Sequence, residues 1–147
     1  MFLLDRVSDP GNMGTIIRTA WALDIEGILL TEDCTDPFSP KVVRASMGGI
    51  LNVPVYTAVS WESIKQLRAK GYQIVGTAID APVNFFDFNY SGANIIVIGS
   101  ESKGVSNDIL VNCDSLIKIP INPVVDSLNA AIACAIIMME IRKQRKR

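Results

Sequence analysis

The hydrophobic positions of the chain fall into short, continuous runs rich in β-branched residues, and these runs predict strands. Six of them occupy residues 2–5, 26–31, 53–58, 72–79, 94–100 and 116–121. Hydrophobic residues in these runs seldom alternate with polar ones, so both faces of each strand are expected to be covered. We therefore predict an α/β fold with a mostly parallel sheet of about six strands and helices on both of its faces.

Between these runs, hydrophobic residues recur at the spacing of a helix. Helices are predicted over residues 13–23, 40–47, 61–70, 107–111 and 127–142. Ser39, Ser60 and Ser106 each precede one of them, where a hydroxyl can accept hydrogen bonds from the first free amides of a helix. No repeat and no linker interrupts the alternation of strands and helices, so we predict one domain over residues 1–147.

The last predicted helix is apolar on almost all of its sides between residues 128 and 139. A helix of this kind must be buried on more than one side. In a chain this short, a second copy is a natural source of the additional surface. We therefore predict a homodimer through this helix; a helix buried wholly within one chain is the alternative.

The composition of the chain excludes several classes of chemistry. It contains no histidine, which rules out Ser-His-Asp and Cys-His catalysis and most zinc chemistry. The spacing of Cys34, Cys113 and Cys134 suggests neither a disulfide framework nor a metal site, so we expect reduced thiols, a cytoplasmic protein and no metal. The longest apolar run, residues 130–139, is too short to cross a bilayer, and no signal peptide is evident. We therefore expect no contact with a membrane.

Charge is distributed unevenly along the chain. The last six residues hold five positive charges, without which the net charge of −1 would be −6. This segment is either a solvated helix end or a basic arm that lies near nucleic acid.

Three clusters of small and polar residues follow predicted strands. The first contains Asn12, a candidate helix cap, and Gly14, which costs about 1 kcal/mol relative to alanine inside a helix. The second lies at residues 96–106 and the third at residues 117–131. Each cluster alone also fits an ordinary cap or tight turn. Because the carboxyl ends of parallel strands meet at one edge of a sheet, a single pocket built from three loops accounts for them better.

Together, the three clusters resemble the motifs of the SpoU family of RNA ribose 2′-O-methyltransferases, part of the SPOUT superfamily. The first supplies Asn12, Gly14 and Arg18, and the second is a Gly-x-Glu-x-x-Gly at residues 99–104. The third is an Ile-Pro pair followed by Ser-Leu-Asn at residues 127–129. Residues 39–55 are also similar to a segment typical of this family, so the resemblance covers nearly the whole chain.

The resemblance implies a deep trefoil knot near the C-terminus, a feature that general rules of chain topology would have argued against. It also implies that the knot binds S-adenosylmethionine, whose methyl group is transferred to a ribose 2′-hydroxyl of rRNA or tRNA. The residues that the resemblance assigns to the cofactor are Thr77, Gly99, Gly104, Ile119, Leu128 and Asn129.

The same resemblance implies the catalytic and RNA-binding residues. The catalytic set is Asn12, Arg18, Glu101, Ser127 and Asn129. The RNA-binding set is Arg18, Lys41, Arg44 and Lys103. A guanidinium stays charged, so we expect Arg18 to anchor a phosphate and stabilise the developing alkoxide. Glu101 is expected either to orient Arg18 or Asn12, or to accept the proton through water.

Two other functions compete with this interpretation. The first is a knotted module that keeps the fold and binds RNA or the cofactor without turnover; the presence of all five residues of the catalytic set weighs against it. A generic nucleotide-binding α/β enzyme is the third reading, but the chain lacks any phosphate-binding fingerprint. Many SpoU proteins carry an RNA-binding domain before the first motif. Here the first strand begins within five residues of Met1, so we expect a minimal member, a fragment or an isolated catalytic domain.

Overall fold

The computed structural model describes residues 1–145 and contains a seven-stranded sheet in which every strand pair is parallel. The strands lie in the order β3-β2-β1-β6-β4-β7-β5. Their bounds are β1 Phe2–Asp5, β2 Ile28–Leu30, β3 Val55–Tyr56, β4 Gln73–Thr77, β5 Val83–Asn84, β6 Asn94–Gly99 and β7 Ser115–Lys118. The predicted α/β class and parallel sheet are thus confirmed. The two-residue strand β5 was not predicted, because so short a segment carries no hydrophobic run.

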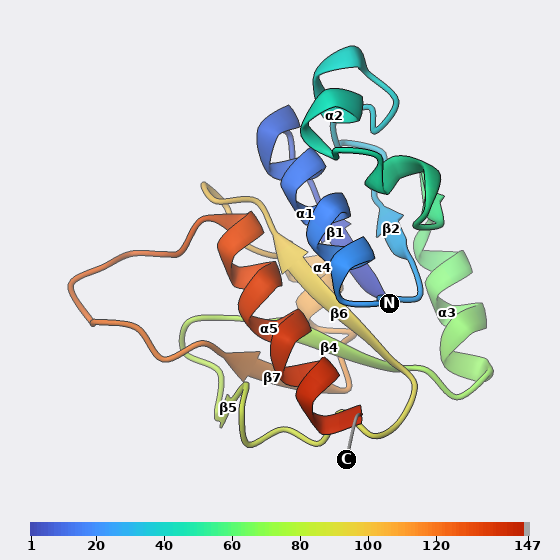
Figure 1. Ribbon diagram of the computed structural model, residues 1–147. Coiled ribbons are helices and arrows are strands. Elements are labelled where there is room, and N and C mark those ends of the chain that lie inside the picture. Colours follow the sequence, from blue (N-terminus) through green and yellow to red (C-terminus); the bar gives the residue numbers. More distant parts are fainter. Residues whose placement is uncertain (146–147) are drawn as a thin grey trace.

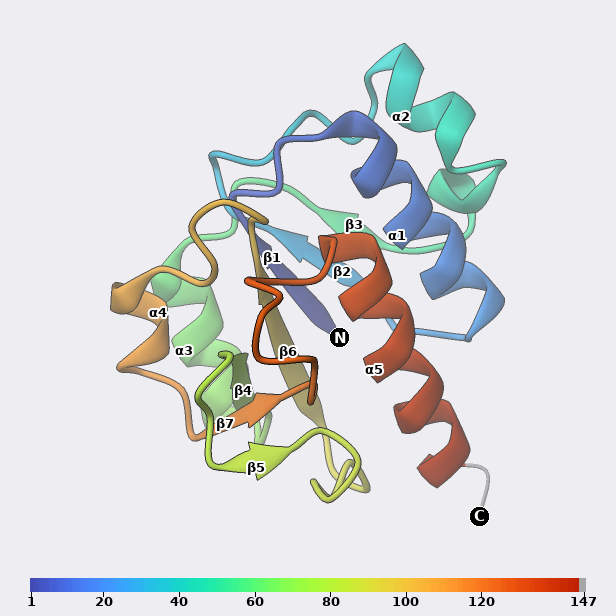
Figure 2. The same ribbon diagram turned by 90° about the vertical axis from the view of Figure 1, so that its left-hand side faces the viewer.

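Helices cover both faces of the sheet, as predicted. Figures 1 and 2 show α1 and α5 side by side on one face and α3 and α4 on the other. The helices are α1 Pro10–Ala22, α2 Pro40–Ala45, α3 Trp61–Ala69, α4 Asn107–Leu110 and α5 Ala130–Arg145, and a short 3₁₀ helix spans Gly49–Leu51. Strand β1 shows how the layers form: Phe2 and Leu4 face the α1–α5 layer, whereas Leu3 faces the α3–α4 layer, since successive strand residues point to opposite faces.

Both helices that frame the expected site begin at different residues from those predicted. Helix α1 starts at Pro10 because the Asp9 side chain caps it, accepting a hydrogen bond from the amide of Asn12 at 2.7 Å. Helix α5 starts at Ala130 because the Asn129 side chain accepts hydrogen bonds from the two following free amides. The prediction that Asn12 caps its helix was therefore wrong, and Ser127, where the last helix was predicted to begin, lies before α5.

Gly14 lies where α1 and α2 are in closest contact. A Cβ atom at this position would come within 2.4 Å of the Ala45 Cβ atom and 2.9 Å of the Val42 carbonyl oxygen. Only glycine allows the two helices to approach this closely. The intrinsic helix penalty of Gly14 is offset by this packing.

Within residues 1–145, no helix is both long enough and apolar enough to cross a membrane.

Candidate functional site

The carboxyl ends of β4, β6 and β7 open onto a cavity of about 500 Å³. This is the edge of an α/β sheet at which ligands generally bind. Five of the six residues expected to bind the cofactor line the cavity, together with three residues from the expected catalytic and RNA-binding sets. These residues are Thr77, Gly99, Gly104, Ile119 and Leu128, and Glu101, Ser127 and Lys103.

The loop after β6 folds back on the end of its own strand. Ser100 and Gly104 form an antiparallel bridge, in which the Gly104 amide donates to the Ser100 carbonyl at 2.8 Å. Gly104 has a φ of +63°, a conformation that favours glycine. A Cβ atom on Gly99 would lie only 2.0 Å from the Gly104 carbonyl carbon. The two glycines of the second motif thus shape the wall of the cavity through close backbone packing.

A hydrogen-bond network joins the three motifs at the rim of the cavity. The Asn12 side-chain amide donates to the Glu101 carboxylate. The Asn129 side-chain amide donates in turn to the Asn12 Oδ1 atom at 3.0 Å, while the Asn129 Oδ1 atom caps α5. Three segments far apart in the sequence therefore meet at one point, and the network fixes the Glu101 carboxylate there.

Thr77 contributes to the cavity through its position. Its hydroxyl donates to the Val97 carbonyl at 2.8 Å, which ties β4 to its neighbour β6. Because this bond joins two strands beneath the cavity, Thr77 helps to hold the cavity floor in place.

The cavity lining is chemically mixed. Carboxylates and ammonium groups both reach it, and its floor is apolar. The acidic residues are Asp80, Glu101 and Asp126, the basic residues are Lys103 and Lys118, and the apolar residues include Ile98, Leu110, Ile117, Ile119 and Leu128. Such a lining suits a ligand that has a planar apolar ring together with groups of both charges.

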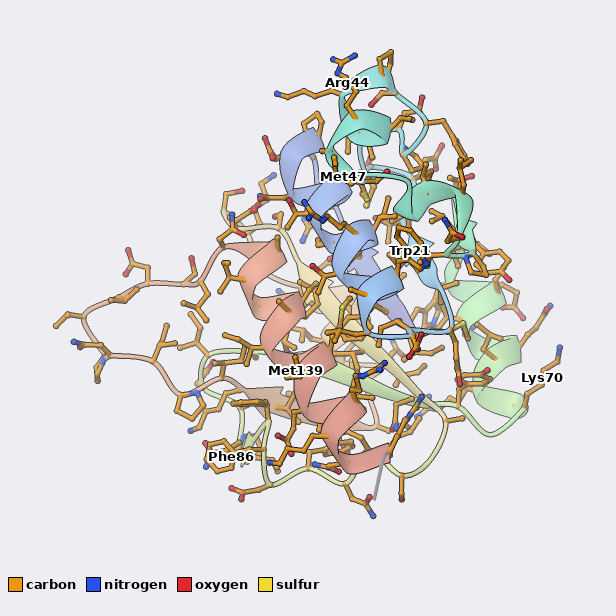
Figure 3. The ribbon with its side chains drawn as sticks, in the orientation of Figure 1. Trp21, Arg44, Met47, Lys70, Phe86 and Met139 are labelled. Carbon is orange, nitrogen blue, oxygen red and sulfur yellow. The ribbon has the colours of Figure 1, made fainter. Side chains whose placement is uncertain are left out.

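Arg18, Lys41 and Arg44 are not among the residues that line this cavity. Arg18 is exposed on α1, six residues after Asn12 and so about 9 Å farther along the helix axis. Lys41 and Arg44 are exposed on α2, and Figure 3 shows Arg44 at the outer end of that helix. Hydrogen bonds unite Asn12, Glu101 and Asn129 in the described structure, and Arg18 is not part of that network.

In its described part, the basic C-terminal segment continues α5 and forms ion pairs with the body of the protein. It is therefore neither a free arm nor a fully solvated helix end there. Arg142 pairs with Asp24, and Arg145 pairs with Glu26 at 3.6 Å. Both carboxylates come from the segment between α1 and β2, so these ion pairs attach the end of α5 to the body. Residues 146–147 of the predicted basic segment lie outside the described residues.

Several residues that line the cavity were not among the site residues predicted from the sequence. Ile79 and Asp80 lie in the loop that follows β4, and Lys118 and Ile121 lie at or beyond the end of β7. The rule that ligands gather at the carboxyl ends of parallel strands could have found them. Asn107 and Leu110, which α4 contributes, carry no comparable signal.

The cysteines near the site are not activated nucleophiles. Burial raises the pKa of the Cys134 thiol above its ordinary range, and the negative charge of Glu101 adds to this effect. Burial, with the nearby charge of Asp114, raises the pKa of Cys113 to about 11. Both thiols are protonated at neutral pH, which makes them poor nucleophiles. Among residues 1–145, no group of three or more His, Cys, Asp or Glu side chains is arranged to hold a metal ion.

Comparisons with known proteins agree with the geometry of this site. The chain is 39% identical over 144 residues to an uncharacterized tRNA/rRNA methyltransferase of Synechocystis sp., covering 97% of this chain and 53% of the relative. It is 34% identical to a 23S rRNA (uridine(2479)-2′-O)-methyltransferase of Streptomyces viridochromogenes, covering 97% of this chain and 52% of the relative. The chain thus spans about half the length of the curated relatives it matches.

A solved structure extends the likeness to three dimensions. The SpoU methyltransferase AviRb from Streptomyces viridochromogenes, in complex with the cofactor AdoMet, superposes with a TM-score of 0.92 and 34% identity. The superposition covers 99% of this chain and 57% of that one. The sequence model of the SpoU rRNA Methylase family matches residues 1–139. This match spans all three motifs that meet at the cavity, and the chain therefore belongs to the SpoU rRNA methylase family.

Proposed function

We propose that this chain is a catalytic unit that transfers a methyl group from S-adenosylmethionine to a ribose 2′-hydroxyl of rRNA or tRNA. The observation that carries the proposal is the cavity at the carboxyl edge, with Asn12, Glu101 and Asn129 joined at its rim. The relative from Streptomyces viridochromogenes is named as a 2′-O-methyltransferase of 23S rRNA, and the AviRb structure holds AdoMet. Residues 1–147 act as one such unit in this proposal.

The cavity residues fit the proposed cofactor. Ile119 and Leu128 supply apolar surface for an adenine ring, and Gly99 and Gly104 allow close contact with the backbone. The charged lining matches a ligand whose methionine part carries an ammonium and a carboxylate beside a positive sulfonium. When bound, the cofactor supplies a methyl group on a positively charged sulfur.

The polar residues at the rim act on the ribose. A 2′-hydroxyl is a poor nucleophile until its proton is removed or its charge is stabilised. Glu101, held by Asn12, accepts that proton through water, whereas Ser127 and Asn129 orient the groups around it. Arg18 contacts the neighbouring phosphate and stabilises the alkoxide as it forms.

Cationic side chains guide the RNA to this edge. Lys103 lies at the cavity, and Lys41 and Arg44 project from α2 into solvent. Each contact with a phosphate releases counterions, so RNA binding weakens as salt rises.

Two copies of the chain associate through α5 in this proposal. Ile132 and Met139 on α5 are about half exposed, as is Trp21 on α1, and Figure 3 shows Trp21, Met47 and Met139 on the same side of the molecule. These side chains form an apolar face of the kind that marks protein interfaces. By contrast, Ile137 and Met138 of the same helix are fully buried within the chain.

The proposal also includes a C-terminal trefoil knot and a cytoplasmic location. The likeness to SpoU structures supports the knot, and the three free cysteines support a reducing compartment. An experimental backbone trace, tested for closure of the knot, checks the first point.

Calorimetry and methyl transfer test the proposed function. We expect S-adenosylmethionine to bind, NAD and ATP not to bind, and a chelator to leave the affinity unchanged. Labelled methyl groups should then appear at 2′-oxygens when rRNA or tRNA is supplied. Binding of S-adenosylmethionine without any transfer would instead indicate a module that binds the cofactor without turnover.

Substitution of Arg18 separates chemistry from cofactor binding. We expect Arg18→Ala to lower the rate of methyl transfer about 100-fold, a loss typical of removing a donor that stabilises transition-state charge. Its affinity for S-adenosylmethionine should stay within a few-fold of wild type, because Arg18 does not line the cavity. Lys65→Ala, an exposed change on α3, serves as the control. Weaker cofactor binding by the Arg18 variant would contradict this assignment.

A further inference from the structure

The turn after β1 has an unusual backbone. Arg6 adopts a φ of +59°, a left-handed conformation that residues other than glycine seldom adopt. Its amide donates to the Thr31 hydroxyl at 3.0 Å, which joins the ends of β1 and β2. A strained conformation persists only where the surrounding structure holds it, so the contacts of the Arg6 side chain need an explanation.

The guanidinium of Arg6 joins this turn to the loop that follows β6. Its Nη2 atom lies 3.3 Å from the Asp5 carboxylate and donates to the Gly104 carbonyl, also at 3.3 Å. Asp5 is only 3% exposed, and its carboxylate accepts a further bond from the Ser106 amide at 2.7 Å. Asp5 and Arg6 thus hold residues 104 and 106 from about 100 positions away in the sequence.

One donor of this guanidinium is buried without a partner. Arg6 Nε has no hydrogen-bond partner among the described residues, and an unpaired buried donor costs about 1–3 kcal/mol. The charge-assisted contact with Asp5 offsets that cost, because hydrogen bonds between ionised groups are about twice as strong as neutral ones. The guanidinium is therefore fixed against the loop rather than directed into solvent.

The loop held by this pair is a wall of the cavity. Residues 100–105 line it, whereas Asp5 and Arg6 do not. Glu101 lies within the same loop and reaches Asn12. Between the end of β6 and the start of α4, the bridge from Ser100 to Gly104 is the internal support of the loop. The position of the wall therefore depends on contacts from outside the loop.

We propose that Asp5 and Arg6 are positioning residues that keep residues 100–106 in the conformation that binds the methyl donor. The affinity for S-adenosylmethionine then depends on an ion pair that does not touch it. This inference rests on the proposed function, since it assumes that this cavity takes that ligand.

Three variants test the pair, and glycine is the most informative replacement. Arg6→Gly suits the left-handed backbone and keeps the amide bond to Thr31, but it removes the guanidinium. Arg6→Lys keeps the charge opposite Asp5 and the same backbone strain. Asp5→Asn keeps an acceptor for the Ser106 amide but loses the ionic partner of Arg6.

Hydrogen exchange at the amides of Gly104 and Ser106 and titration with S-adenosylmethionine are the two measurements. In Arg6→Gly we expect about tenfold faster exchange at both amides and about tenfold weaker binding, with β1 and β6 exchanging as in wild type. Arg6→Lys should recover most of the affinity, and Asp5→Asn should fall between these two variants.

Several results would overturn the proposal. Unchanged affinity in Arg6→Gly would do so, whether or not exchange accelerates. Exchange that accelerates equally across the sheet would show that the pair serves only general stability. If the wild-type chain fails to bind S-adenosylmethionine, the proposed function fails instead, and exchange at Gly104 still reports whether Arg6 holds the loop.

Discussion

At the scale of single residues, two glycines matter because they lack a side chain, which lets neighbouring segments pack closely against them. Gly14 lies in the middle of α1, where its missing side chain permits contact with Ala45. Gly99 does the same for the backbone of Gly104 and Val105. Both glycines belong to the motifs that meet at the cavity, and close packing against neighbouring backbone explains why each position requires glycine.

Gly14→Ala tests this reading against helix propensity. Alanine should gain about 1 kcal/mol as a helix former, but its Cβ atom would overlap Ala45, and overpacking costs about 1–3 kcal/mol. We expect the free energy of unfolding, measured by urea denaturation, to fall by up to about 2 kcal/mol. Thr15→Ala, at the exposed neighbouring position, is the control and should raise the free energy of unfolding by about 0.5 kcal/mol, because alanine is the better helix former. A more stable Gly14→Ala variant would refute the packing argument.

The thiols give a second prediction at this scale. Burial raises the pKa of Cys113 to about 11 from an ordinary value of 9.0. The neutral thiol is thus favoured in the folded state, which contributes stability below pH 9 that is lost as pH rises through 11. We expect slow alkylation by iodoacetamide at pH 8 and a normal rate in urea. Cys113→Ala should show a shallower loss of stability between pH 9 and 11, and equal slopes would contradict the assignment.

At the scale of elements, the start of α5 is fixed by one asparagine. Asn129 caps the helix with its oxygen and reaches Asn12 with its amide nitrogen. One side chain therefore sets where the helix begins and joins that helix to α1. The end of α5 is attached to the body by Arg142 and Arg145, so both ends of the helix are tied down.

Asn129→Ala should remove both contacts of this side chain. Loss of a helix cap lowers stability by about 1 kcal/mol, and we expect that change in the free energy of unfolding by chemical denaturation. Ser127→Ala is the matched control, because Ser127 lies before the helix and does not cap it. If the two substitutions lowered the free energy of unfolding equally, the capping role of Asn129 would be contradicted.

For the whole molecule, the exposed apolar face over α1 and α5 is the surface that we propose a second copy covers. Trp21, Ile132 and Met139 contribute to it (Figure 3). We expect the wild-type chain to sediment as a dimer at micromolar concentration. A double substitution, Ile132→Glu with Met139→Glu, should yield monomers because two charges would have to be buried at the interface.

Val111→Glu is the control for this experiment. Val111 is 79% exposed at the end of α4, on the opposite side of the sheet, so its substitution should leave the dimer intact. A wild-type chain that sediments as a monomer would remove the argument for this interface.

The sequence by itself determined the fold class and most of the elements. Continuous apolar runs such as residues 2–5 and 94–99 have no polar face, which leaves a covered parallel strand as their stable state. Glycines and short polar side chains directly after such strands also marked the site, because parallel strands present their carboxyl ends at one edge. The resemblance to the SpoU motifs in these loops then singled out Glu101 and Leu128, and both line the cavity.

Only the tertiary structure decided which of these residues meet. Asn12 contacts Glu101, which lies 89 positions farther along the chain, and Asn129, which lies 117 positions farther along. No local pattern in the sequence encodes contacts over such separations. The first residues of α1 and α5 also differ from the predicted ones. Asn12 has a side chain suited to capping, but it bonds to Glu101 and Asn129, and Asp9 caps α1 instead. Asn129 both caps α5 and reaches Asn12. Local propensity proposes a role for a side chain, and the packing of distant segments determines which role it takes.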